Sequence, residues 1–383
     1  ATFADKRLSA QGQGVLADGS AISASLRLED LQTAPYSFKQ SRIDGEARIE
    51  IKDLRPLAAL VYPAADPSGR LRGDLKVAGS AVAPQMALSL ALSEGEVRIP
   101  PLGIGLGELA MKMDGTYPTY RLSLAGASGG RLRGEGELSL ADRQSPELRL
   151  KIQGEGFTLA RLPELDLLIS PDVEAGWRGD QVEVRGMIVV PEARFAPRDL
   201  AGAVSPSADV VIVGSGEEQP AAGLSLAADL MVTAGDAVRV DAFGLRGRVT
   251  GRLRVTDLPG KPVTGDGILN VDEGTFAVYG RELTIRTGRL LYNGNPLDNP
   301  GLQVRAESRD REMTTGIQVS GFLAEPEISF YSDPPMEENE IISRLLMNTA
   351  LLGSGENDRT FLGSMTGGTG LEPLTSTVRG VTE

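Results

Sequence analysis

The chain has 383 residues, of which 41% are hydrophobic and 24% charged, so it can bury a core and is neither a disordered tail nor a membrane bundle. Its formal net charge of -13 removes the attraction that dominates binding to nucleic acids. It contains no Cys and no His, which excludes disulfides, thiolate metal sites and the commonest general base in enzymes. We therefore expect a protein that is not an enzyme and that has no cofactor.

The first residues, ATFADKRLSAQGQG, lack the apolar centre of a signal peptide. No segment of the chain approaches the roughly 20 consecutive apolar residues that a membrane-spanning helix needs. The chain begins with Ala1 and not with Met. We interpret it as a processed product or an excised fragment, and we expect any anchor or export signal to lie upstream of it.

Apolar and charged side chains alternate with a period of two along most of the chain, as half-buried β-strands require. The clearest example places Leu71, Leu75 and Val77 between Arg70, Arg72, Asp74 and Lys76. The same alternation returns at 148–153 and 246–255. Each predicted strand therefore has one apolar face and one solvated face.

A strand, turn and strand pattern also recurs in both halves of the chain. Two apolar residues two positions apart are followed by Gly or Asp, a short turn and a proline that opens the next strand. The copies that match best are Leu75, Val77, Gly79 and Pro84, and Ile317, Val319, Gly321 and Pro326. Long runs of such strands without helices argue against βαβ units and favour an elongated solenoid-like sheet over a sandwich or barrel. We predict one repetitive β region over 1–335.

The C-terminal end departs from this pattern. Over 336–352 the apolar residues fall on one stripe, which predicts an amphipathic helix. Asp333 is expected to cap this helix, Pro334 to lie near its first turn, and Glu337, Glu338 and Glu340 to lie at the positive end of its dipole. The residues from 353 to 383 are rich in Gly, Ser and Thr and are predicted to be flexible.

Three other patterns are better explained by structure than by chemistry. The glycines at 103, 105 and 107 lack the Lys and the strand, loop and helix context of a phosphate-binding loop. The acidic cluster at 337–340 lacks the alternating spacing of a calcium loop. The arginines between 246 and 254 are expected to form a strand face that is covered by water. The alternative is that they contact anionic lipid headgroups.

The apolar face itself is the remaining candidate for function. If the strands curl into a trough that does not close, their inward residues line a concave apolar groove, and in water such a groove must be filled by something apolar. Phospholipid acyl chains would fit it. The candidate lining residues are Leu253, Val255, Leu269, Val271, Leu283, Ile285, Leu302, Val304, Ile317 and Val319.

Several segments resemble a known family. The block GILNVDEGTFAVYGRELTIRTGRLLYNGNPLDNPGLQVRA and the later block TGIQVSGFLAEPEISFYSDPPMEENEIISRLL are similar to the C-terminal region of the TamB family of AsmA-like proteins. The similarity covers about 65–350 and is clearest over 65–335. The residues that carry it, and that are expected to hold turns and strand register, are Tyr279, Gly280, Arg281, Gly288, Pro296, Asp298, Asn299, Pro300, Gly321, Pro326, Asp333 and Pro334.

This resemblance implies a β-taco fold with an apolar groove, in the periplasmic part of a protein anchored to the inner membrane of a diderm bacterium. It implies TamA, an outer-membrane barrel of the Omp85 class, as a partner. Members of the family typically end in a further amphipathic β segment that is proposed to engage TamA, whereas this chain ends in LEPLTSTVRGVTE. We therefore expect the TamA contact and the membrane anchor to lie outside this chain.

Two functions follow as hypotheses. The first is a conduit in which acyl chains slide along the groove and carry phospholipids between the inner and outer membranes. The second is a scaffold that presents sheet edges to autotransporters or unfolded outer-membrane barrel proteins during their assembly. A surface adhesin or polysaccharide-binding rod is a weaker alternative, because aromatic residues make up only 4% of the chain.

Overall fold

The computed structural model describes residues 2–4, 6–16, 18–33, 36–37, 41–55, 66–80, 82–100, 103–142, 144–196, 225–242, 244–278, 281–310 and 313–347. The predicted helix residues 348–352 and the predicted flexible tail, 353–383, lie outside these ranges. Contacts divide the chain into two compact units. Unit 1 is made of Ala1–Leu162, Leu167–Val189 and Gly223–Leu230, and unit 2 of Pro163–Asp166, Val190–Ala222 and Met231–Glu383.

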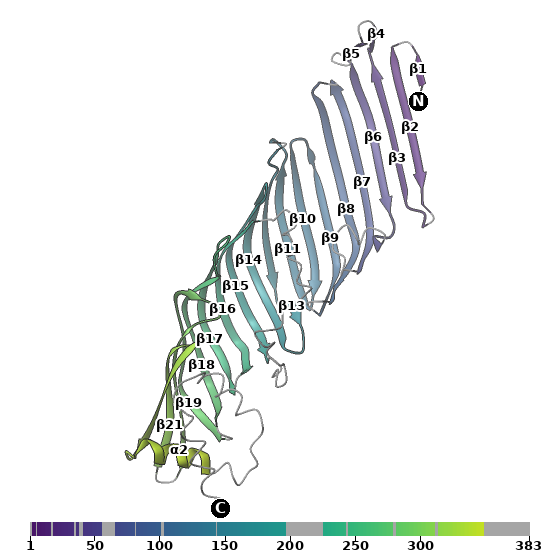
Figure 1. Cartoon of the computed structure of the whole chain (residues 1–383). Helices are drawn as coiled ribbons and strands as arrows, with labels where there is room; N and C mark the ends of the chain where they lie inside the picture. The colour runs from purple at the N-terminus through teal and green to yellow at the C-terminus, as the bar shows by residue number, and fades with distance from the viewer. Residues whose placement is uncertain are drawn as a thin grey trace, which may run out of the picture. The chain divides into compact units, whose positions relative to one another are not determined.

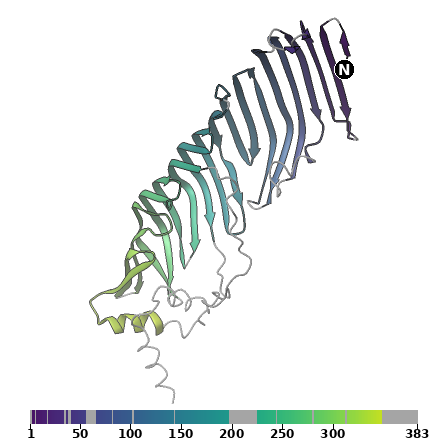
Figure 2. The same ribbon diagram turned by 45° about the horizontal axis from the view of Figure 1, so that its top comes forward.

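Unit 1 is built almost entirely from antiparallel strands that follow one another in the chain. Figures 1 and 2 show β6 to β11 lying side by side in sequence order. Pairing runs from β1 through β2, β3 and β6 to β12, and β12 then pairs with β14. The long strands are β2 (Arg7–Val15), β3 (Ala21–Glu29), β6 (Arg42–Ile51), β7 (Asp66–Ser80), β8 (Pro84–Ile99), β9 (Ile104–Thr116), β10 (Thr119–Ser128), β11 (Gly130–Ser139), β12 (Glu147–Glu155) and β14 (Leu165–Arg178). The short ones are β1 (Thr2–Ala4), β4 (Gln32–Thr33), β5 (Tyr36–Ser37) and β13 (Phe157–Arg161), and β4 pairs with β5 alone.

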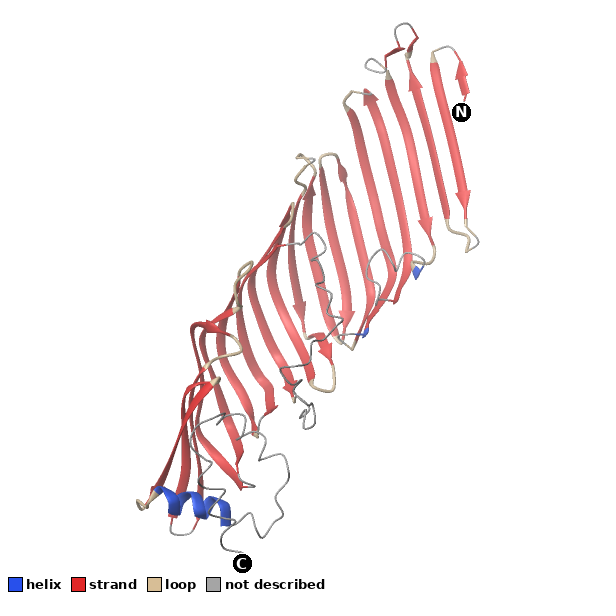
Figure 3. Ribbon diagram, in the orientation of Figure 1, coloured by secondary structure: helices blue, strands red, loops and turns tan. Residues whose placement is uncertain are grey.

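Unit 2 repeats this architecture with fewer strands. Its consecutive antiparallel strands are β17 (Leu245–Asp257), β18 (Thr264–Val278), β19 (Arg281–Pro296), β20 (Gly301–Asp310), β21 (Met313–Phe322) and β22 (Glu325–Asp333). Helix α2 (Glu338–Met347), drawn in blue in Figure 3, follows β22. Two further strands, β15 (Gln181–Phe195) and β16 (Ser225–Ala242), contribute residues to both units, and so does β14, whose first two residues belong to unit 2.

The recurring sequence pattern corresponds to β-hairpins with one common register. Gly79 pairs with Pro84 at the end of the β7–β8 hairpin, and Gly321 pairs with Pro326 in the same way between β21 and β22. Both glycines have positive φ angles, of 106° and 84°, which residues with a side chain rarely adopt. Both prolines lie in the first two positions of their strand, where a missing N–H is tolerated. The predicted hairpins are confirmed.

The start of the C-terminal helix differs from the prediction. Asp333 is the last residue of β22 and pairs with Thr314, so it does not cap the helix. The capping position belongs to Glu337, whose carbonyl oxygen accepts hydrogen bonds from the backbone N–H groups of Glu340 and Ile341, at 2.9 and 3.1 Å. Strand pairing keeps Asp333 extended. The residue that caps the helix is therefore four positions later in the chain than the predicted cap, Asp333. The acidic first turn is confirmed, with Glu338 and Glu340 in it.

The described residues form consecutive antiparallel strands and one short α-helix, which confirms the predicted all-β fold class. Among the described pairings, β22 pairs only with β21 and β1 only with β2. The best-packed core lies in unit 2, where Leu283 and Ala306 have exposed fractions of 0%.

Candidate functional site

Strand register in unit 1 arranges apolar and glycine residues into three continuous rows, which we call the apolar rows. Each row takes one residue from each of eight strands, β6 to β12 and β14. The first row is Ile49, Gly73, Leu90, Met113, Leu122, Gly136, Leu150 and Ala175, and the second is Ile51, Leu71, Leu92, Met111, Leu124, Gly134, Ile152 and Val173. The third is Ala47, Leu75, Leu88, Gly115, Tyr120, Leu138, Leu148 and Trp177.

Two glycines of these rows, Gly73 and Gly134, are covered by the side chains of their neighbours. A Cβ added at Gly73 would lie 2.7 Å from Cγ2 of Ile49 and 3.1 Å from Cδ1 of Leu90. At Gly134 it would lie 2.7 Å from Cγ of Leu124. Contacts this short would force the neighbouring side chains to move. The apolar surface therefore extends across the positions of Gly73 and Gly134 without a gap.

The side chains in the apolar rows are mostly half-buried and not fully buried. Leu75, Leu90, Met111 and Leu124 are all half-buried, while most of the charged residues that alternate with such positions, including Arg72, Lys76 and Lys112, are exposed. Tyr120 and Val173 are exceptions, with exposed fractions of 5% and 7%. A contiguous and partly solvated apolar surface of this kind is uncommon on soluble proteins and marks a binding surface.

The opposite face of unit 1 carries charges that neutralise one another, both within single strands and between neighbouring strands. Arg48 pairs with Asp74 at 3.3 Å, and Lys112 pairs with Asp114 at 3.1 Å. Further pairs on this face are Arg70–Glu94, Arg72–Glu50, Lys151–Asp172, Arg149–Glu147 and Arg178–Glu147. Because these side chains are largely exposed, each pair contributes little stability. The pairs identify this face as the one that water covers.

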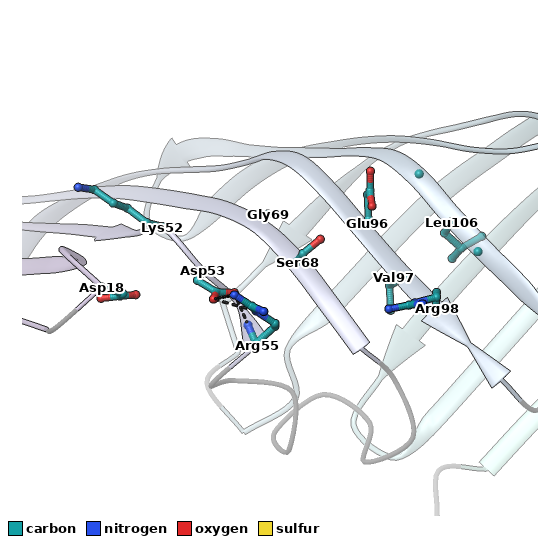
Figure 4. Close-up of a pocket in the computed structure, with 12 residues that line it drawn as sticks. Asp18, Lys52, Asp53, Arg55, Ser68, Gly69, Glu96, Val97, Arg98 and Leu106 are labelled. Carbon is teal, nitrogen blue, oxygen red and sulfur yellow. Dashed lines mark hydrogen bonds and ion pairs between the residues drawn. The ribbon is translucent and has the colours of Figure 1, made fainter.

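A hollow of about 1000 Å³ in unit 1 is lined mainly by polar groups (Figure 4). The acids that line it, Asp18, Asp53 and Glu96, are matched by the bases Lys52, Arg55 and Arg98. Asp53 and Arg55 form an ion pair of 2.6 Å within it, and hydrogen bonds from Arg55 lower the pKa of Asp53. A lining with balanced charges and internal ion pairs favours no anionic or cationic ligand.

In unit 2 the register places all the predicted groove residues on one face. Val304 pairs with Val319, and Ile317 pairs with both Ala306 and Phe330. The other predicted residues lie on the same face through the pairings Leu253–Gly267, Val255–Gly265, Gly251–Leu269, Val249–Val271, Phe276–Leu283, Leu290–Leu302 and Ile285–Ala306. The period of two in the sequence was sufficient to predict that these side chains share one face.

Most of these residues pack against one another and are closed to solvent. Leu283, Ile317 and Val271 have exposed fractions of 0%, 2% and 5%, and they form one core cluster with Ile341 of α2, which is 3% exposed. The remaining predicted members of this cluster are Ile285, Leu302 and Val319, with Val304 packed against it. Leu253 is also buried, and Val255 and Leu269 are half-buried. The role of these residues in lining a lipid groove stays a prediction.

Several residues of the family motif lie where two turns of unit 2 meet. The side chain Oδ1 of Asn299 accepts a hydrogen bond from the backbone N–H of Ala324 at 3.0 Å. The carbonyl oxygen of Pro300 accepts one from Leu323 at 3.0 Å, and that of Pro296 accepts one from Asn299 at 3.1 Å. The turn between β19 and β20 is thereby tied to the turn between β21 and β22.

Other motif residues lie beside this turn or elsewhere in unit 2. Burial raises the pKa of the Tyr292 hydroxyl, and the negative charge of the exposed Asp298 raises it further. A Cβ at Gly288 would lie 3.0 Å from Cβ and from the carbonyl oxygen of Val271, so a side chain there would push against the neighbouring strand. Arg281 is the first residue of β19, Pro334 directly follows β22, and Tyr279 and Gly280 lie outside the described residues.

Within the described ranges, no helix is both long enough and apolar enough to cross a membrane. The acidic side chains of those ranges form no group of three or more that is placed to hold a metal ion.

Comparison with known proteins identifies the family. A profile of the TamB C-terminal domain matches residues 121–383. The chain belongs to the TamB family. It is 23% identical over 355 residues to the translocation and assembly module subunit TamB of Haemophilus influenzae, an alignment that covers 88% of this chain and 27% of that protein. The chain thus spans about a quarter of the length of this TamB relative.

Reasoning from sequence missed the apolar rows of unit 1 as a candidate site. The signal was present, because Leu75, Leu88, Leu122 and Leu148 all follow the period of two. Their alignment into rows depends on the register of successive hairpins, and bulges shift that register. One such shift separates Ser68 from Arg70.

Proposed function

We propose that this chain is part of a lipid-transfer conduit in which phospholipid acyl chains lie along the apolar rows of unit 1. The observation that supports this most directly is the continuity of half-buried apolar side chains across eight strands, with charges confined to the opposite face. Neighbouring strands are separated by about 4.8 Å, so each row extends over roughly 30 Å. One leaflet of a bilayer is about 15 Å thick in hydrocarbon, so a row is long enough to hold an extended acyl chain.

A surface of this kind would hold lipid through many weak contacts. Dispersion between two carbon atoms contributes only about 0.1–0.2 kcal/mol, so no single leucine determines affinity and a chain can slide between equivalent positions. The phospholipid headgroup would stay in water. In this proposal the protein acts between the two membranes of a diderm bacterium, in the periplasm, as part of a longer membrane-anchored protein. TamA is its proposed outer-membrane partner, as the resemblance to the TamB family implies.

The first step of the experiment is native mass spectrometry of the purified 383-residue chain. The proposal predicts phospholipid bound to the wild type and loss of most of it in Leu90→Arg, because a charge in the middle of the first apolar row disfavours hydrocarbon contact. Ala87→Arg is the matched control, since Ala87 is an exposed residue of the same strand, β8, on the opposite face. Circular dichroism checks that both variants fold.

Two results would overturn the proposal: a folded wild type that carries no phospholipid, or Leu90→Arg and Ala87→Arg with equal lipid content. Leu90 is a better test than the predicted groove residue Val271. Val271 is 5% exposed within the packed core, so Val271→Arg would report on the folding of unit 2.

A second candidate function is a scaffold for outer-membrane proteins under assembly, which fits the words translocation and assembly in the name of the TamB relative. Among the described residues, β22 pairs on one side only, with β21. An unpaired strand edge can add a strand from another polypeptide. This function predicts binding of an unfolded barrel protein that is unchanged in Leu90→Arg.

A further inference from the structure

Three turns at one end of the unit 2 strands form a hydrogen-bonded edge, which we call the turn rim. It consists of 258–263 between β17 and β18, 297–300 between β19 and β20, and 323–324 between β21 and β22 together with Phe322, the last residue of β21. Because the strands are antiparallel and consecutive, these three turns lie on the same side of the sheet. The backbone N–H of Leu297 donates to the carbonyl of Val263 at 3.1 Å, and that of Leu323 donates to Pro300 at 3.0 Å.

The turn rim exposes large apolar side chains. Leu258, Val263, Phe322 and Leu323 have exposed fractions of 42%, 36%, 52% and 42%. Single exposed apolar residues are normal on protein surfaces, but here four of them lie on neighbouring turns that are bonded to one another. The concentration of these residues on one edge indicates an interaction surface.

The backbone of the turn rim has few hydrogen-bond donors left for a partner. The N–H groups of Lys261 and Asn299 donate to carbonyls within their own turns, and the N–H of Ala324 donates to Oδ1 of Asn299. Prolines at 259, 262, 296 and 300 have no N–H at all. Strand addition needs free donors and acceptors along an edge, so this rim does not suit it. A lipid phase, in contrast, requires that backbone polar groups be satisfied internally.

The charges of the turn rim favour binding to lipid by insertion of apolar side chains over binding by electrostatic attraction. Lys261 is its one basic residue, and the acidic Asp298 belongs to the neighbouring turn, which is bonded to the turn of Lys261 through Leu297 and Val263. Without a cluster of cations, attraction to anionic headgroups supplies little binding. Apolar and aromatic side chains at turn tips bind by burying their surface at the boundary between headgroups and acyl chains.

We propose that the turn rim of unit 2 inserts into the surface of a phospholipid bilayer. Phe322, Leu323 and Leu258 enter the boundary between headgroups and acyl chains, and Lys261 extends its ammonium group back to the headgroups. This inference goes beyond the conduit, because it assigns a membrane-docking surface in unit 2 and does not depend on lipid moving along the apolar rows of unit 1.

The test is flotation of the 383-residue chain with phosphatidylcholine vesicles at 0.15 M salt. The wild type is expected to float with the vesicles, and the combined variant Leu258→Ser, Phe322→Ser and Leu323→Ser is expected to lose at least tenfold in partitioning. Ile268→Ser is the matched control, because Ile268 is 48% exposed on a strand, β18, away from the rim. It should bind as the wild type does.

Fluorescence gives a second readout that does not depend on affinity. Trp177, in unit 1, is the one tryptophan of the chain, so Trp177→Phe combined with Phe322→Trp places a single reporter on the rim. Vesicles with brominated acyl chains should quench this reporter, and they should not quench Ile268→Trp in the same background.

Several outcomes would overturn the proposal. They are absence of binding to phosphatidylcholine vesicles, unchanged binding of the combined Ser variant, binding that needs anionic lipid and disappears in 0.5 M salt, and a wild-type dimer that the Ser variant abolishes. Leu90→Arg in unit 1 is expected to float normally. A failure of membrane docking is therefore distinguishable from a failure of the conduit.

Discussion

Asn299 illustrates how a single side chain connects neighbouring turns in unit 2. Its Oδ1 atom accepts from the N–H of Ala324, while its own carbonyl oxygen accepts from Nδ2 of Asn295 at 2.6 Å. Asn299→Ala removes only the first of these bonds. A net hydrogen bond contributes about 0.5–1.5 kcal/mol, so we expect the free energy of unfolding to fall by that amount in urea titration.

The control for this prediction is Asn299→Asp, because an aspartate keeps an oxygen that can accept from Ala324. It should retain most of the stability that Asn299→Ala loses. Equal stability of the wild type and Asn299→Ala would contradict the assigned role of the side chain.

Glu147 provides a pH-dependent contact on the charged face of unit 1. Hydrogen bonds from Arg178, at 2.8 Å, and from Arg149, at 2.7 Å, lower the pKa of its carboxyl group. A lowered pKa in the folded state means that this contribution to stability is complete above the ordinary glutamate pKa of about 4.3 and is lost as the pH falls through the lower folded-state value.

We therefore expect Glu147→Gln to melt at a lower temperature than the wild type at pH 7, with a difference that shrinks below pH 4. The effect should be small, because these side chains face solvent. Thermal melts between pH 7 and pH 3 measure it. A difference that grows on acidification would have the wrong sign.

At the scale of elements, α2 is attached to unit 2 chiefly through an apolar contact. Ile341 belongs to the core cluster of the sheet, whereas Glu338 and Glu340 face solvent. A helix of 10 residues is too short to be stable alone in water, so its order depends on this packing. Truncation of a buried isoleucine to alanine costs about 2–5 kcal/mol.

Ile341→Ala should release the helix while β19 to β21 stay folded. We expect faster hydrogen exchange across α2 and new protease cleavage near it, with little change in the exchange of β20. Glu338→Ala, an exposed substitution in the same turn, should change neither. Unchanged exchange of α2 in Ile341→Ala would show that other contacts hold the helix.

Two copies of the hairpin pattern show what the sequence of an element determines. Leu75 and Val77 in β7, and Ile317 and Val319 in β21, occupy the same positions of hairpins with the same register. The period of two and the Gly and Pro positions were sufficient to predict strands, turns and a shared apolar face. They were not sufficient to predict burial. Leu75 and Val77 are half-buried, whereas Ile317 and Val319 are 2% and 7% exposed.

Burial depends on what covers a face, and no local pattern contains that information. In unit 2 the cover comes from the cluster around Ile341 and from aromatic residues such as Phe276 and Phe330, which are distant from Ile317 in sequence or on other strands. For the same reason the bond between Asn299 and Ala324, which joins two turns, could not be predicted from either turn alone. The period of two grouped the predicted groove residues on one face of the strands, but it could not show that most of them are buried in the packed core of unit 2.

At the scale of the whole molecule, the same alternation of apolar and charged residues occurs in both units, but the apolar side chains are buried to different degrees in the two. Regions with few fully buried apolar contacts open locally at low free energy, while packed cores open only near the global free energy of unfolding. Unit 2 contains the packed cluster of Leu283, Ala306 and Ile317. The apolar rows of unit 1 are mostly half-buried.

Without lipid, amides of β19 to β21 should therefore exchange hydrogen more slowly than those of β7 to β10. A short-chain phosphatidylcholine, added below its micelle concentration, should slow exchange in β7 to β10 by covering the apolar rows, and leave β19 to β21 unchanged. Leu90→Arg should remove this protection and Ala87→Arg should keep it. Protection by lipid that appears only in unit 2 would instead place the acyl chains among the residues around Ile317, and would require that packed cluster to open.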